Sequence, residues 1–161
     1  MNFKKVNTLS GWIVFAIAYI VYLLTLEPTS SLWDCGEFLA AAYKLEVVHS
    51  PGAPLFLLIG RIFSLFAPSP LHIAVCINSV SALTSALTIL FLFWTITHFA
   101  RILLQSKAEV AGDKSRLAAV MGAGLVGALA YTFSDTFWFS AVEGEVYAMS
   151  SFFTAVVFWA I

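Results

Sequence analysis

The chain has 161 residues, of which 61% are hydrophobic and 11% are charged, and its mean hydropathy is +0.94. A water-soluble domain of this length cannot bury so many apolar side chains, so lipid must be the solvent for most of the chain. The net charge of -1 excludes the basic character of a nucleic-acid-binding protein. The two cysteines, Cys35 and Cys76, provide neither a disulfide framework nor a metal-ligand spacing. The sequence therefore predicts an all-α polytopic membrane helical bundle.

The first apolar run follows a basic start at Lys4 and Lys5, an order that secretory signal peptides share. The run is long for a signal peptide and lacks a small-residue cleavage site. We therefore expect residues 10–26 to form a first membrane helix that also directs insertion.

A charged loop is expected at residues 27–70. Its segment Leu55–Ala67 is apolar, but its 13 residues would make only about 20 Å of helix, which is too short to cross the membrane. Pro68 and Pro70 end this segment. We expect Leu55–Ala67 to be a helix that lies in the membrane interface.

Three further spans are expected, at residues 72–100, 117–133 and 146–161. From Tyr147 onward the last one would be only about 22 Å long, shorter than a hydrocarbon core of about 30 Å. We therefore expect residues 1–161, with about four spans, to be the N-terminal transmembrane part of a longer protein.

The basic residues predict the orientation of the bundle. Six of them fall on one side of these spans: Lys4, Lys5, Arg101, Lys107, Lys114 and Arg116. Only Lys44 and Arg61 fall on the other side, so the N-terminus is expected in the cytoplasm. Seven of the nine acids fall on the outer side: Glu27, Asp34, Glu37, Glu46, Asp135, Glu143 and Glu145. Such an acidic cluster above a membrane bundle indicates a functional surface.

Asp34 and Glu37 are three residues apart, so both would point the same way from a helix. The alanine-rich residues 35–48 favour such a helix, capped by Ser30, Ser31 or Asp34. Its positive end would keep Asp34 ionised and able to accept a proton from a substrate hydroxyl. The alternative, a capping residue beside a solvated acid, stays open.

The cations of the outer side are candidates for binding a phosphate group. His49 begins a rigid turn, HSPGAP, and could bind phosphate, relay protons or only hold the loop. Arg61 could instead extend towards lipid headgroups, and Lys44 could be a solvated residue on a helix face.

Residues 134–145 are expected to be a second outer loop. Glu143 and Glu145 would point to opposite sides if the next helix began early, and acids at span ends are often exposed. Phe137, Trp138 and Phe139 are typical of an interfacial aromatic belt.

The sequence GAGLVG has the spacing of a dinucleotide-binding fingerprint. It lies inside the predicted span 117–133, where glycines instead allow close helix packing.

Two stretches carry a resemblance to a known family. Residues 26–67, with the blocks WDCGEF and HSPGAP, and residues 133–155, with AVEGEVYAM, resemble a family of polytopic membrane proteins labelled as a domain of unknown function. The family has many bacterial members and includes an animal transmembrane protein O-mannosyltransferase. Its second block usually has a proline where this chain has Ser50.

The resemblance implies a GT-C glycosyltransferase. Such an enzyme would move a sugar, here mannose, from a polyprenyl-phosphate donor to a Ser or Thr hydroxyl of an acceptor protein. The reaction would take place on the periplasmic side of a bacterial inner membrane. Asp34 would be the base of an inverting transfer, with Glu37 second. Lys44, His49 or Arg61 would bind the phosphate.

The resemblance also implies that a second outer-loop acid, Glu143 or Glu145, serves the same site. The paired acids could hold Mg²⁺ or Mn²⁺ with phosphate oxygens, although a base needs no metal. Two other classes stay open. A transporter should carry acids inside its spans, and the predicted spans contain none. A non-catalytic helical membrane module should tolerate alanine at Asp34 and Glu37.

Overall fold

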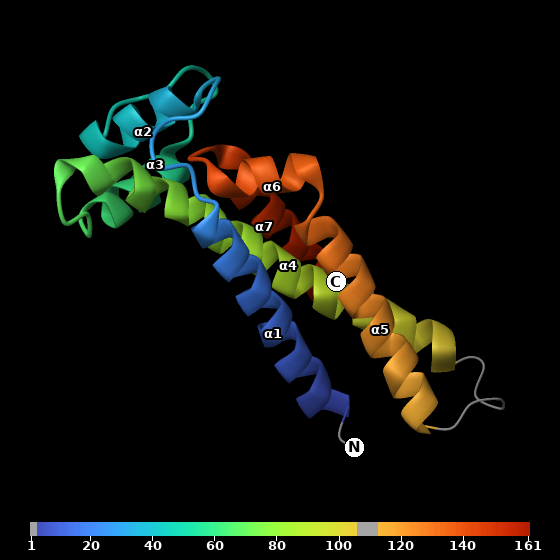
Figure 1. The fold of residues 1–161 in the computed structure, drawn as a ribbon. Coiled ribbons are helices and arrows are strands. Elements are labelled where there is room, and N and C mark those ends of the chain that lie inside the picture. The colour runs from blue at the N-terminus through green and yellow to red at the C-terminus, as the bar shows by residue number, and fades with distance from the viewer. Residues whose placement is uncertain (1–2, 106–112) are drawn as a thin grey trace.

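Helices account for the regular structure of this computed structural model, which describes residues 3–105 and 113–161; the described residues contain no strand. In chain order the elements are α1 (Phe3–Leu24), α2 (Cys35–Lys44), α3 (Pro54–Ser64), the short 3₁₀ helix η1 (Pro70–His72), α4 (Ile73–Gln105), α5 (Asp113–Thr132), α6 (Asp135–Val142) and α7 (Val146–Ala160) (Figure 1). The prediction of an all-α membrane helical bundle is confirmed.

Three helical segments are long and apolar enough to cross a membrane: Phe3–Leu24, Pro70–Leu104 and Lys114–Thr132. They correspond to the first three expected spans, and the first begins earlier than its apolar run because α1 includes the polar residues before it. The apolar helix α7 has only 15 residues. A fourth span at residues 146–161 therefore stays a prediction.

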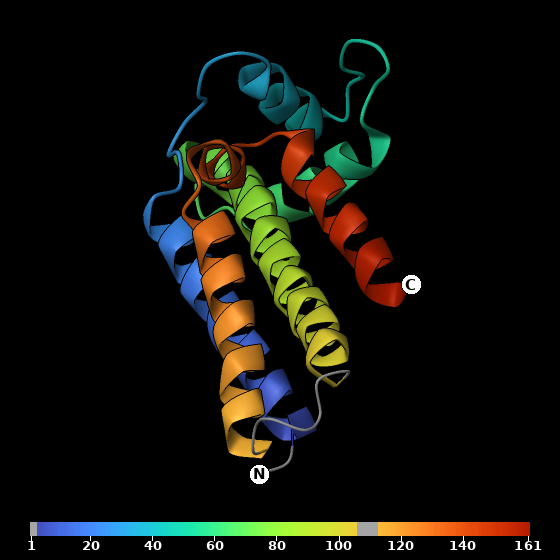
Figure 2. The same cartoon turned by 90° about the vertical axis from the view of Figure 1, so that its right-hand side faces the viewer.

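The long helix α4 is the centre of the bundle. It packs against α1, α5 and α7, which surround it in Figure 2, and 61% of its most apolar window is buried, against 22% for α1 and 28% for α5. A Cβ atom at Gly124 would lie 2.6 Å from the Thr97 side chain, and one at Gly127 would lie 2.7 Å from Ile96. Two of the three expected packing glycines therefore bring α5 close to α4, whereas Gly122 faces open space.

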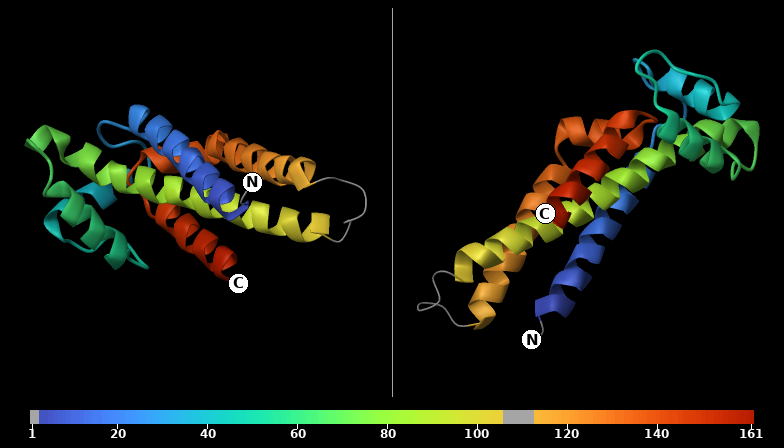
Figure 3. Two further views of the ribbon diagram at one scale, coloured as in Figure 1. Left: turned by 90° about the horizontal axis from the view of Figure 1, so that it is seen from below. Right: turned by 180° about the vertical axis from the view of Figure 1, so that it is seen from behind.

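One end of the bundle carries α2 and α3, which lie across the start of α4 (Figure 3). Their shared core includes Phe38 of α2, Phe56 of α3 and Ile77 of α4. Helix α2 begins at Cys35, as expected, but ends at Lys44 rather than near residue 48, because Leu45 adopts a left-handed conformation with φ 58°. This end of the bundle is called the outer end below.

Residues 134–145 were expected to be a loop, and that prediction is wrong, because residues 135–142 form α6. Packing of Phe137 and Ala141 against the core supports this short helix. Phe137 is therefore a core residue in contact with Tyr22 rather than part of an exposed aromatic belt, whereas Phe139 is exposed.

The opposite end of the bundle contains the start of α1, the end of α4 and the start of α5 (Figure 1). Five of the six basic residues used for the orientation belong to these helix ends, namely Lys4, Lys5, Arg101, Lys114 and Arg116. The sixth, Lys107, lies outside the described residues. The cytoplasmic position of this end stays a prediction.

Candidate active site

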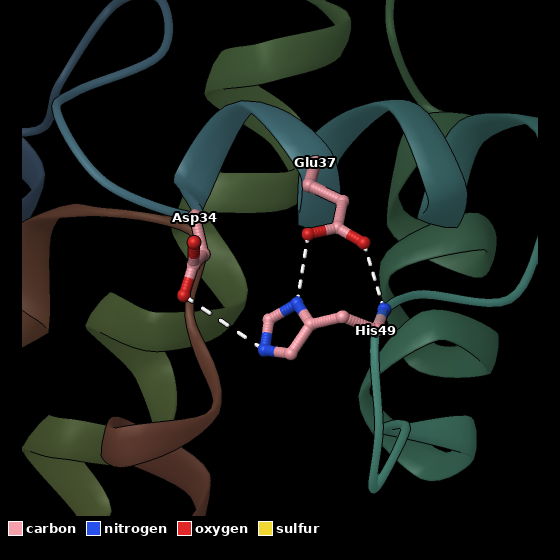
Figure 4. A network of polar contacts seen from close by, with 3 residues as sticks. All are labelled: Asp34, Glu37 and His49. Atoms are coloured by element: carbon pink, nitrogen blue, oxygen red, sulfur yellow. Dashed lines mark hydrogen bonds and ion pairs between the residues drawn. The ribbon is translucent and has the colours of Figure 1, made fainter.

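Asp34, Glu37 and His49 meet on the surface of the outer end (Figure 4). Glu37 accepts a hydrogen bond of 2.8 Å from the backbone N–H of His49, and its other carboxylate oxygen lies 2.8 Å from His49 Nδ1. On the far side of the ring, His49 Nε2 lies 3.9 Å from an Asp34 oxygen. The imidazole therefore lies between two carboxylates, and this arrangement is called the Asp34 group below.

The backbone on both sides of α2 sets this arrangement. Leu45 turns the chain back in the left-handed region, and Gly52, with φ 79°, closes a tight turn by donating a hydrogen bond to the His49 carbonyl. On the other side, Asp34 occupies the N-cap position, but its side chain makes no capping hydrogen bond. The prediction that the Asp34 side chain could cap α2 is therefore wrong. Its carboxylate faces His49 instead.

The two partners of the ion pair shift each other's pKa. Two hydrogen bonds from His49 lower the pKa of Glu37. The bond from the His49 ring has the larger effect and the bond from its backbone N–H the smaller. The hydrogen bond to Glu37 and the charge of that carboxylate raise the pKa of His49, and the charges of Asp34 and Glu145 add to this effect. Since the Asp34, Glu37 and His49 side chains are 44–56% exposed, water and substrates can reach the group.

Glu143 and Glu145 lie in the connection between α6 and α7, beneath the first outer loop. They are 3% and 5% exposed, so the expectation of exposed acids is wrong. Glu143 and Glu145 would point to opposite sides only if both were in a helix. Both instead have extended backbones, and α7 begins after them at Val146. Burial raises the pKa of both carboxyls.

The two buried glutamates face different neighbours. The Ser31 hydroxyl donates a hydrogen bond to Glu143, and the charge of Glu27 acts on the same carboxyl. Besides burial, the charge of Glu143 raises the pKa of Glu145, the charge of Asp34 raises it further, and the charge of His49 lowers it. The structure thus brings Glu145 towards the Asp34 group and joins Glu143 to the first outer loop.

Lys44 and Arg61 are not brought to the Asp34 group. Lys44 is the last residue of the ten-residue helix α2, about 15 Å along the axis from its start, and is an exposed partner of Glu46 at 3.9 Å. Arg61 donates a 2.9 Å hydrogen bond to the Tyr43 carbonyl and lies over the Tyr43 ring. Arg61 therefore fastens α3 to the end of α2.

The Asp34 group has the donors of a divalent-cation site. One oxygen from each carboxylate and one imidazole nitrogen lie within 4.8 Å of one another. Carboxylate oxygens suit Mg²⁺ and Mn²⁺, and the imidazole nitrogen suits Mn²⁺ better than Mg²⁺. The residues present therefore fit such an ion, but the ion pair of Glu37 and His49 also satisfies the same atoms.

Two further residues hold the site together: Ser31, which was predicted only as a possible helix cap, and Asn78, which sequence reasoning missed. The fully buried Asn78 amide donates hydrogen bonds of 2.7 Å and 3.0 Å to the carbonyls of Glu27 and Thr29. The available signal was an amide side chain in a mainly apolar predicted span, because such a side chain must find hydrogen-bond partners when it is buried.

Comparisons with known proteins place the chain in a family. The model of the protein O-mannosyl-transferase TMEM260 N-terminal domain matches residues 34–161. A protein O-mannosyl-transferase tmem260 of Dictyostelium discoideum is 28% identical over 151 residues, which cover 90% of this chain and 16% of that relative. A protein O-mannosyl-transferase TMEM260 of Mus musculus is 27% identical over 144 residues, which cover 89% of this chain and 18% of that relative. The chain thus spans less than a fifth of the curated relatives it matches. No solved structure matches the chain.

Proposed function

Because this chain belongs to the protein O-mannosyl-transferase TMEM260 N-terminal domain family, we propose that it is the N-terminal membrane part of a protein O-mannosyltransferase. The enzyme moves mannose from a polyprenyl-phosphate carrier to a Ser or Thr hydroxyl of a translocated protein. The observation that carries the proposal is the Asp34 group, an accessible set of two carboxylates and an imidazole within the matched residues.

In the proposed reaction the acceptor hydroxyl oxygen attacks the anomeric carbon of the sugar. Asp34 takes the hydroxyl proton, the bond from the anomeric carbon to the phosphate oxygen breaks, and the lipid phosphate leaves with inversion. Asp34 suits this role because its carboxylate makes no capping bond and is 56% exposed. Both oxygens of Glu37 are engaged by His49, so Glu37 orients the imidazole rather than acting as the base.

His49 is the cation proposed to stabilise the leaving phosphate. A protonated imidazole next to the reacting centre offsets negative charge that develops in the transition state, and the carboxylates around His49 favour its protonated form. Lys44 and Arg61 lie at the far end of α2 and are not assigned this role.

The outer face of α3 supports a position at the membrane surface. Leu58 and Ile62 are more than half exposed on this helix, and Phe66, just beyond it, is 78% exposed. Apolar side chains on one face of a short helix favour burial among lipid chains. We propose that this face lies in the outer leaflet, where it contacts the carrier lipid, and that the basic opposite end faces the cytoplasm of a bacterial cell.

A divalent cation is part of the proposal as an optional component. If Mn²⁺ binds Asp34, Glu37 and His49, it would supply positive charge for the donor phosphate in place of the protonated imidazole, because a histidine that ligates a metal is neutral. Dialysis against EDTA should then abolish mannose transfer, and Mn²⁺ should restore it. Full activity after EDTA treatment would remove the metal and leave the base mechanism intact.

The placement of the acids argues against a transporter. The three candidate spans contain no Asp or Glu, whereas ion-coupled transporters use ionisable groups inside the membrane.

A transfer assay with the complete protein in lipid vesicles tests the proposed function. Mannose should move from the lipid-phosphate donor to a peptide that contains Ser, and a matched peptide with Ala at that position should accept none. A nucleotide-linked mannose offered alone should not replace the lipid donor. Absence of transfer to the Ser peptide would refute the proposal.

A further inference from the structure

Asn78 of α4 is the one described side chain that hydrogen-bonds two carbonyls of the first outer loop. Its Nδ2 atom donates to Glu27 and to Thr29, five residues before Asp34. Because both acceptors are carbonyl oxygens, the side-chain nitrogen must face them, and the Oδ1 atom must point the other way. That oxygen is buried without a hydrogen-bond partner among the described residues.

The Oδ1 atom faces the second outer loop at Gly144. A Cβ atom at Gly144 would lie 2.7 Å from Asn78 Oδ1 and 2.9 Å from Leu39 Cδ2 of α2. Gly144 therefore lies in close contact with α4 and α2, between Glu143 and Glu145. A single side chain of α4 thus touches both outer loops.

Other contacts join the start of the first outer loop to α6 and to the connection that follows it. The Glu27 backbone N–H donates a 3.0 Å hydrogen bond to the Val142 carbonyl, and Trp138 Nε1 donates one of 3.0 Å to the Thr25 hydroxyl. The hydrogen bond from Ser31 to Glu143 completes the connection. These contacts flank Asn78, the fully buried member of the set.

We propose that Asn78 is a positioning residue that holds the first outer loop against the connection between α6 and α7 and so fixes the position of Asp34. This role rests on the proposed function for its catalytic consequence, but the structural coupling does not depend on it. An amide is the short side chain whose single nitrogen can donate to two carbonyls at once. A carboxylate of the same shape would place negative oxygens against those carbonyls.

The test compares Asn78→Asp with Asn7→Asp in the complete protein. Asn7 lies near the start of α1, at the opposite end of the bundle, so the control makes the same chemical change away from the outer loops. Cys35 reports the exposure of the loop, because it follows Asp34 in the sequence and its side chain is fully buried. Its rate of labelling by a membrane-impermeant maleimide is measured with Cys76→Ser present in every variant.

Asn78→Asp should label Cys35 at least about tenfold faster than the parent, since two hydrogen bonds of the loop are lost. The kcat per folded molecule should fall roughly a hundredfold, because small displacements of a catalytic group cost about this much. If Asn78 served only overall stability, the folded fraction would keep the parental kcat. Asn78→Leu, which removes the donors without adding charge, gives the same readouts if the aspartate variant does not fold.

Parental labelling rate and parental kcat in both Asn78 variants would overturn the proposal. If the parent protein transfers no mannose, the proposed function fails, but the labelling rates still decide whether Asn78 holds the loop. Faster labelling in Asn7→Asp as well would also overturn it, because the effect would not be specific to the outer end.

Discussion

The Asp34 group and the pair of Glu143 and Glu145 lie at the same end of the bundle, yet their carboxyls behave in opposite ways. Glu37 is on the surface, where hydrogen bonds from His49 lower its pKa. Glu143 and Glu145 are buried, and burial raises theirs. The difference teaches that environment rather than residue type decides which acid is ionised. The exposed group carries the proposed chemistry, and Glu143 of the buried pair joins the first outer loop to the connection between α6 and α7.

The strongest expected effect on stability is at Gly144, between the two buried glutamates. Gly144→Ala would force a methyl group against Asn78 and Leu39, and such overpacking typically costs about 1–3 kcal/mol. Thermal unfolding in detergent measures this loss. The matched control is Gly122→Ala, since a Cβ atom there meets no atom within 4 Å. Equal stability of the two variants would contradict the tight packing of the second outer loop.

A smaller effect is expected at Ser31, whose hydroxyl donates a hydrogen bond to the buried Glu143. Ser31→Ala should lower the free energy of unfolding by about 0.5–1.5 kcal/mol. The bond from Ser31 lowers the pKa of Glu143, so its loss should raise that pKa further and make the ionised carboxyl more costly. The loss of stability should therefore be larger at pH 8 than at pH 5. Ser30→Ala, next to it on the exposed loop, is the control; a pH-independent loss would contradict the assignment.

The smallest effect is expected at the exposed ion pair, and its sign depends on pH. His49 has a raised pKa, so its contribution to stability is complete below the unfolded value of 6.5 and is lost as pH rises through the folded value. Glu37 has a lowered pKa, so its contribution is complete above 4.5 and is lost as pH falls through the folded value. His49→Gln should therefore differ most from the parent between these values.

Unfolding temperatures at pH 5.5 and pH 9 check this expectation. His72→Gln serves as the control, because the ring of His72 lies against the Ser69 hydroxyl, whereas that of His49 lies against a carboxylate. A difference between His49→Gln and the parent that stays constant from pH 5.5 to pH 9 would show that the ion pair does not form.

The sequence predicted the parts of the fold that depend on apolar length. A membrane span needs about 20 mainly apolar residues. The three long apolar runs of the sequence meet this length, and they form α1, α4 and α5. Helix α6 was missed because its stability comes from packing of Phe137 and Ala141 against other helices, which composition alone does not show.

The candidate site was predictable where it is local. The spacing of Asp34 and Glu37 predicted that both would point the same way, and the composition predicted the helix start at Cys35. The approach of His49 to both acids depends on the left-handed backbone conformations of Leu45 and Gly52. These lie outside the helices, so the periodic spacing of residues did not predict them. The burial of Glu143 accompanies its contact with Ser31, which lies 112 residues away in the sequence.

The central claim is that the exposed Asp34 carboxylate is the base for sugar transfer. The most direct measurement is kcat for mannose transfer by the complete protein with Asp34→Asn, beside Asp135→Asn as a control on the exposed surface of α6. Loss of a general base typically lowers the rate by about 10²–10⁴-fold, so Asp34→Asn should show that loss and Asp135→Asn should match the parent. Parental kcat in Asp34→Asn would contradict the account.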